Sequence, residues 1–154
     1  MNRTRIALTL PLALWLSAAT PAAKQTCPEL VIDLQTRWDK ITFQMPEDER
    51  ADAYATLAED AFAGTTAQAN CTEAWVWQGI AEASYADAGN IFVALGAVRR
   101  AHAALTESVH QDDRVLAGAA HTALAVIHHR SYPWPLGLGD DELAAEHFKL
   151  ALAL

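Results

Sequence analysis

Apolar and small residues recur with helical spacing through most of the chain, and this periodicity limits the fold more than any other sequence feature. Between residues 91 and 105 they fall at i, i+3, i+4 and i+7, as Ile91, Ala94, Leu95, Val98, Ala101 and Leu105. A similar stripe runs from Leu116 to Ile127. No segment shows the alternating apolar and polar pattern of a strand. We therefore expect an all-α protein.

Signals for helix starts and ends divide the chain into six helices with short connections. Pro28 and Pro46 stand in the first turns of two of them, and three acidic residues follow Pro46, where the positive end of the helix dipole favours them. Asp140 and Asp141 begin the last helix. The expected helices cover about residues 28–41, 46–64, 72–86, 91–110, 112–130 and 140–154.

Length and charge narrow the class of protein. The chain has 154 residues, which is enough for one domain with a hydrophobic core. Its formal net charge is -8, so it has no basic face with which to neutralise phosphates. We therefore expect no nucleic-acid partner.

Residues 1–23 have the pattern of a signal peptide. Arg3 and Arg5 precede an apolar run at residues 6–16, and small residues suited to cleavage follow that run. A membrane anchor is the competing interpretation, but a span needs roughly 20 apolar residues and this run is about half as long. We expect a periplasmic or secreted protein without stable membrane insertion after cleavage, whose helical domain covers residues 24–154.

Export changes the interpretation of the two cysteines. Cys27 and Cys71 would both reach an oxidising compartment, where a pair of thiols usually forms a disulfide. The alternative is two separate buried thiols. A disulfide closing a loop of this length would stabilise the fold by about 4 kcal/mol.

Bulky and small residues also recur at fixed offsets between residues 72 and 154. One pattern pairs Trp75 with Gly79 and Leu116 with Ala120, and a second appears as Ala94, Val98 and Ala101 and again as Ala144, Phe148 and Ala151. Together they resemble the tetratricopeptide repeat, a helix-turn-helix unit of about 34 residues. The resemblance implies antiparallel helix pairs stacked as a short α-solenoid.

The repeats are degenerate. Glu82 stands where the first helix of the family usually has an aromatic residue, and the loop around residues 131–139 is an insertion. The last apolar helix reaches Leu154 without a glycine or proline to end it, so we expect a domain truncated at its C-terminus, with an uncapped helix that could self-associate. The pattern is also similar to exported helical proteins that accompany tripartite periplasmic transporters.

Motifs for catalysis or metal binding do not emerge from the sequence. The histidines lack the spacing of H-E-x-x-H, no serine lies in G-x-S-x-G, and the paired aspartates suit helix caps. We expect no enzyme activity, no cofactor and no metal site.

The resemblance places a binding groove on the first helices of the repeats. The positions carried over are Glu73, Val76, Ile80, Ser84, Arg114, His121 and His128. The alternative is that the two histidines are simply packed between helices.

The proline-rich loop is a second candidate contact surface. Tyr132 and Trp134 alternate with prolines in it, so we expect a stiff, extended loop that packs on the last two helices and could also dock a partner. The expected function is a non-enzymatic adaptor for a protein or peptide. The alternative is a small-molecule-binding helical protein, such as an accessory component of a periplasmic solute transporter.

Overall fold

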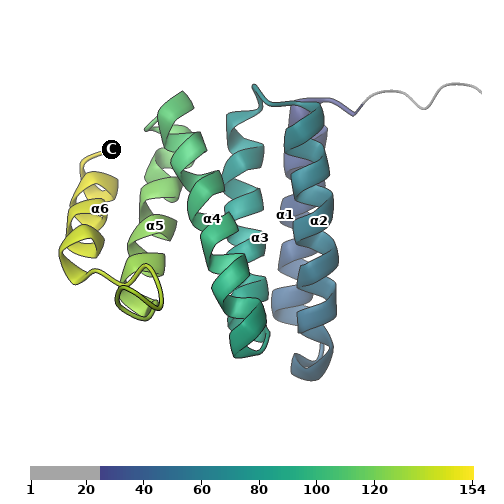
Figure 1. The fold of residues 1–154 in the computed structure, drawn as a ribbon. Helices are drawn as coiled ribbons and strands as arrows, with labels where there is room; N and C mark the ends of the chain where they lie inside the picture. Colours follow the sequence, from purple (N-terminus) through teal and green to yellow (C-terminus); the bar gives the residue numbers. More distant parts are fainter. Residues whose placement is uncertain (1–24) are drawn as a thin grey trace, which may run out of the picture.

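The computed structural model describes residues 25–154, and this part of the chain contains six α-helices and no β-strand (Figure 1). The helices are α1 (Cys27–Gln44), α2 (Arg50–Ala67), α3 (Thr72–Ala88), α4 (Ile91–Gln111), α5 (Ala119–Arg130) and α6 (Asp141–Ala153), with short 3-10 turns η1 (Glu47–Glu49) and η2 (Val115–Gly118). The all-α prediction is confirmed. The predicted signal peptide lies outside the described residues.

The helices stand side by side in a row that follows the order of the chain, from α1 and α2 at one end to α6 at the other (Figure 1). Each helix packs mainly on its neighbours in this row, and α3 contacts helices on both sides. Two hydrophobic clusters fill the row. One lies among α1, α2 and α3 around Leu34 and Leu57, and the other among α3, α4 and α5 around Val76, Leu105 and Leu124.

Side-chain caps explain where two of the helices begin. The Asn90 side chain accepts hydrogen bonds from the first backbone N–H groups of α4, and Asp140 does the same for α6 at 3.0 Å. These caps satisfy donors that have no partner inside the helix. The predicted starts at Ile91 and at Asp140–Asp141 are confirmed.

The predicted start of the fifth helix at residues 112–113 is wrong. Leu116, Ala117 and Gly118 all have positive φ angles, of 48°, 53° and 76°. Three consecutive left-handed residues cannot continue a right-handed helix, so α5 begins only at Ala119. Leu116 is 43% exposed and lies before α5, so it does not share a helix face with Ala120.

A disulfide joins Cys27 to Cys71, as predicted. It connects the first residue of α1 to the residue just before α3, across a sequence separation of 44 residues. Disulfides are typical of proteins in oxidising compartments. Among residues 25–154, no helix combines the length and the apolar character that crossing a bilayer requires.

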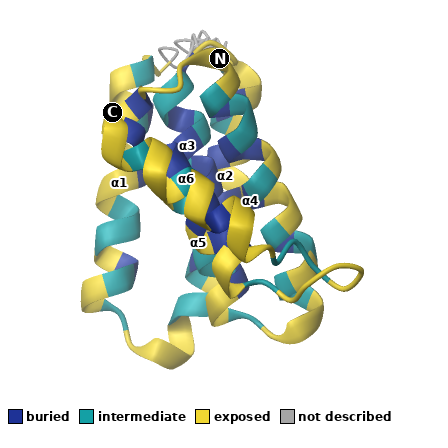
Figure 2. Cartoon of the chain, turned by 90° about the vertical axis from the view of Figure 1, so that its left-hand side faces the viewer, coloured by how far each residue is buried: buried dark blue, intermediate teal, exposed yellow. Residues whose placement is uncertain are grey.

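The outer side of α6 is not covered by any described residue. Figure 2 shows this helix at the end of the row with most of its surface exposed. Its buried residue is Ala144, whereas Leu150 and Leu152 are 42% and 89% exposed. On its inner side, α6 approaches the backbone of Gly118, where an added Cβ would lie 3.3 Å from Ala151.

Candidate functional site

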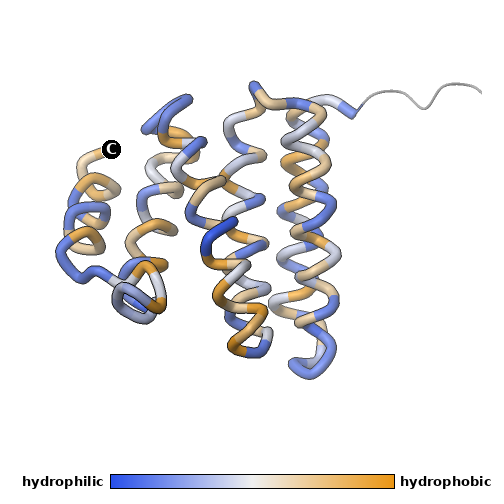
Figure 3. The backbone as a smooth tube through the Cα atoms, viewed as in Figure 1, coloured by the Kyte–Doolittle hydropathy of each residue, from blue (hydrophilic) through white to orange (hydrophobic). Residues whose placement is uncertain are grey.

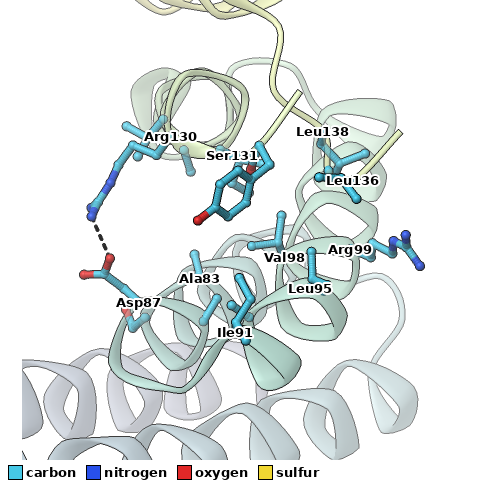
Figure 4. Close-up of a pocket in the computed structure, with 18 of the residues that line it drawn as sticks. Ala83, Asp87, Ile91, Leu95, Val98, Arg99, Arg130, Ser131, Leu136 and Leu138 are labelled. Carbon is cyan, nitrogen blue, oxygen red and sulfur yellow. Dashed lines mark hydrogen bonds and ion pairs between the residues drawn. The ribbon is translucent and has the colours of Figure 1, made fainter. Parts of the chain in front are cut away.

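A cavity of about 390 Å³ lies between α3, α4 and α5 and is closed on one side by the loop that precedes α6 (Figure 4). Its walls are mainly aliphatic: Ile80, Ala83, Ile91, Ala94, Leu95, Val98, Ala123, Val126, Ile127, Leu136 and Leu138. Cavities of this size with apolar walls and few polar groups are typical of small-molecule sites. The cavity is therefore the main candidate functional site.

Three charged side chains also line the cavity. Arg130 donates a hydrogen bond to Asp87 at 2.6 Å, so these two charges form a pair on one side. Arg99 lies on the opposite side, beyond Leu95, with its guanidinium directed away from the cavity in this structure, and forms no ion pair with another described residue (Figure 4). The lining therefore carries one cation in excess, on a chain whose net charge is -8.

The loop at residues 131–139 folds back on itself and is not extended, contrary to the prediction. Gly139 donates a backbone hydrogen bond to the Tyr132 carbonyl at 2.8 Å, and Leu136 donates one to Pro133. A Cβ at Gly137 would overlap the Tyr132 carbonyl, so the turn requires glycine there.

The loop faces the cavity with part of its side chains only. Tyr132, Leu136 and Leu138 line it, whereas Trp134 is 85% exposed. Figure 3 shows hydrophobic residues at the start of α4 and in this loop, which are the two segments on either side of the cavity. The expected stacking of the loop on α5 is present at its end, through a hydrogen bond between His128 Nδ1 and the Leu138 carbonyl at 2.7 Å.

The groove predicted from the repeat resemblance is not open. Val76, His121 and His128 are buried, with 0%, 5% and 6% exposure, so a partner cannot reach their side chains. Glu73 lies beside the disulfide at the start of α3, and Arg114 is exposed before η2. Among the predicted groove positions, Ile80 and Ser84 line the cavity. Close helix packing covers three of the predicted binding positions, and the others lie apart from one another. The predicted positions therefore do not form one surface.

His121 and His128 belong to a cluster of four histidines from three helices. His121 Nδ1 lies 2.9 Å from His147 Nδ1, the His128 and His147 rings are parallel at 5.7 Å, and His102 meets His128 edge-on at 5.3 Å. The spacing of seven residues correctly predicted that His121 and His128 share a face. Nothing in the sequence indicated that His102 and His147 would meet them from α4 and α6.

The geometry of the His121–His147 pair is that of a hydrogen bond. The ring centroids are 5.2 Å apart. This distance equals the separation of the two Nδ1 atoms plus about one ring radius for each ring, so the two Nδ1 atoms point directly at each other. Two nitrogens bound to one tetrahedral metal with bonds of about 2.0 Å would lie about 3.3 Å apart, so the observed 2.9 Å suits a hydrogen bond better. The described residues include one group with three close ligand atoms, Cys27, Cys71 and Glu73, and its two sulfurs form the disulfide.

The surroundings of His102 and His147 disfavour protonation of these two side chains. Burial lowers the pKa of His102, and the nearby His128 lowers it further. Burial is also the largest influence that lowers the pKa of His147, followed by His121, while Glu146 acts in the opposite direction. His102 and His147 therefore tend to stay neutral at neutral pH.

Comparison with known proteins gives no match: no family model, no curated protein and no solved structure is significantly similar to this chain.

Proposed function

We propose that this chain is a non-catalytic binding protein whose cavity between α3, α4, α5 and the 131–139 loop holds a small apolar molecule with an anionic group. The observation that carries this proposal is the cavity itself, about 390 Å³ with aliphatic walls. A compact cavity of this kind suits a small ligand better than an extended peptide, which needs a long groove. This is the small-molecule alternative of the sequence analysis.

The anionic group follows from the charges beside the apolar walls. Arg99 has no carboxylate partner among the described residues, while Arg130 already pairs with Asp87. A ligand carboxylate near Arg99 would supply the partner, and the guanidinium geometry suits a carboxylate. The net charge of -8 disfavours anions elsewhere on the protein, so this local cation would give selectivity.

A protein adaptor is the second candidate function. Its support is the exposure of aromatic residues next to the cavity walls: Phe92 follows Ile91 and is 87% exposed, and Trp134 in the loop is 85% exposed. Aromatic residues are favoured at the centres of protein interfaces. In this version an apolar side chain of the partner would occupy the cavity.

We also propose that the helices are degenerate tetratricopeptide repeats, which the stacked helices support. We further propose a periplasmic or secreted location, which the disulfide supports.

Calorimetric titration with decanoate, decanol and decylamine tests the small-molecule proposal, because these ligands share an apolar chain and differ in charge. We expect saturable binding of decanoate and weaker binding of decylamine. Ala94→Trp should fill the cavity and weaken decanoate binding by about tenfold or more. Ala103→Trp is the matched control, since Ala103 is an exposed residue of the same helix and does not line the cavity.

Three results would distinguish the possibilities. Equal binding of decanoate and decanol that is insensitive to Arg99→Gln would remove the anionic group from the proposal. No saturable binding of any of the three ligands, or binding unaffected by Ala94→Trp, would refute the cavity as a small-molecule site. Loss of a captured protein partner upon Trp134→Ser with no small-molecule binding would favour the adaptor.

A further inference from the structure

We propose that the four-histidine cluster is a pH-sensitive latch, which holds the 131–140 loop and α6 on the helical row at neutral pH and releases them when the histidines become protonated. The cluster comprises His102, His121, His128 and His147. The loop forms one wall of the cavity, so opening the latch would also open the cavity. That last consequence, ligand release in acid, rests on the function proposed above.

The cluster supplies a large part of the polar attachment of this end of the chain. His128 contributes twice: its Nδ1–H donates to the Leu138 carbonyl at 2.7 Å, and its own carbonyl accepts the Asp140 N–H at 3.0 Å. Both bonds persist when the imidazole is protonated, so the pH-sensitive link of the latch is the one between His121 and His147. The hydrogen bond between His121 and His147 joins the middle of α6 to α5. Apart from these bonds, α6 is held by the exposed pair between His129 and Asp141 and by packing on α5 and η2, where Ala144 is its buried residue.

Protonation acts directly on the His121–His147 bond. A hydrogen bond between two Nδ1 atoms needs one nitrogen that donates and one that accepts. The pair can hold one extra proton and keep this arrangement, but with two extra protons both Nδ1 atoms carry hydrogen and the bond is lost. Positive charge on His128 and His102 would add repulsion within the cluster, because each of these rings lies within 5.7 Å of a neighbouring histidine ring.

Few groups near the cluster can neutralise such charge. From α6, Glu146 favours protonated His147, but it is exposed. The segment η2 has no titratable residue, and Asp87 of α3 is already paired with Arg130. His129 and Asp141 form a separate surface pair at 3.2 Å. The cluster thus has several potential cations and one exposed carboxylate.

The pKa directions agree with release in acid. The pKa values of His102 and His147 are lowered in the folded protein, so the released segment binds protons more readily than the latched one. The stabilisation from these two groups is fully present above their ordinary pKa of about 6.5 and is lost as the pH falls below it. Carboxylates remain ionised down to about pH 5, so histidine effects can be isolated between these values.

Hydrogen exchange followed by mass spectrometry tests the latch without any ligand. Labelling times are scaled to the intrinsic exchange rate at about pH 7.5 and about pH 5, in the presence of a chelator. We expect protection of residues 141–153 to fall severalfold at the lower pH, while α2 and α3 keep theirs. Triple replacement of His121, His128 and His147 by Asn should abolish the pH dependence, because Asn can place an amide where Nδ1 was and cannot take up a proton.

Two further variants keep the test decisive. His147→Asn changes only the half-buried member on α6 and should reduce the pH dependence if the triple variant fails to fold. His110→Asn is the control, since His110 is exposed on α4 outside the cluster, and it should behave like the unmodified protein. Unchanged protection of α6 between the two pH values, or equal pH dependence in the Asn variants, would overturn the latch.

Decanoate titration at both pH values then separates the proposals, because opening of α6 without any decanoate binding would refute the cavity function alone.

Discussion

At the scale of single residues, Glu82 shows how a charged group is accommodated inside the helical row. It is a carboxylate with 4% exposure on α3, and Arg100 of α4 donates two hydrogen bonds to it at 2.7 and 2.8 Å. The bond to Glu82 is the main influence that raises the pKa of Arg100, so the arginine stays charged. The repeat resemblance predicted an aromatic residue where Glu82 stands, and the sequence could not identify the partner of Glu82, which comes from the next helix.

Removal of Arg100 should therefore destabilise the protein. Arg100→Ala leaves the buried Glu82 without its donor and should lower the free energy of unfolding by about 2 kcal/mol. Arg99→Ala is the matched control and should change it by less than about 0.5 kcal/mol, since Arg99 is exposed and forms no ion pair with a described residue. Urea unfolding measures both free energies, provided that the slope of free energy against urea concentration is the same for the variants and the unmodified protein. Equal effects of the two variants would show that the pair does not stabilise the fold.

At the scale of helices, the contact between α3 and α4 depends on a glycine. A Cβ at Gly79 would overlap the Leu105 side chain and lie 3.2 Å from the Ala101 carbonyl. Two helices can approach this closely only where one has no side chain. The sequence predicted this position correctly as a small residue at helical spacing.

Two glycine substitutions should consequently differ in the size of their effects. Gly79→Ala should lower the free energy of unfolding by about 1–3 kcal/mol through overpacking against Leu105. Gly96→Ala should change it by less than about 1 kcal/mol, because the Cβ contact at 3.3 Å with the Arg100 guanidinium, which Glu82 holds in place, offsets the preference of the helix for alanine. Thermal and urea unfolding of both variants provide the comparison. A neutral or stabilising Gly79→Ala would mean that α4 can move away without cost.

The elements that sequence reasoning recovered are those with local signals. Periodicity located α4, and the acidic start at Asp140 together with periodicity located α6, because these signals act within a few residues. The delayed start of α5 was missed, since neither Leu116 nor Ala117 favours a left-handed conformation by itself. The cavity and the four-histidine cluster were also missed, because both depend on which helices become neighbours.

At the scale of the whole molecule, the row of helices is secured at both ends by different chemistry. In such a row each helix contacts mainly its neighbours, so opening starts most easily at the ends. The histidine cluster secures α6 at one end. At the other end, the disulfide ties the start of α1 to the start of α3, and α1 otherwise packs only on α2 and α3 through residues such as Leu30 and Leu34.

Reduction of the disulfide should therefore affect the α1 end far more than the rest. The chain-entropy estimate for a separation of 44 residues is about 4 kcal/mol, which we expect as the loss in free energy of unfolding after reduction. Hydrogen exchange should show α1 losing protection first, while the cluster around Val76, Leu105 and Leu124 stays protected until global unfolding. A Cys27→Ser, Cys71→Ser variant is the control, and its stability should not respond to reductant. Two freely alkylated thiols in the unreduced protein, or uniform loss of protection along the row, would contradict this account of how the α1 end is held.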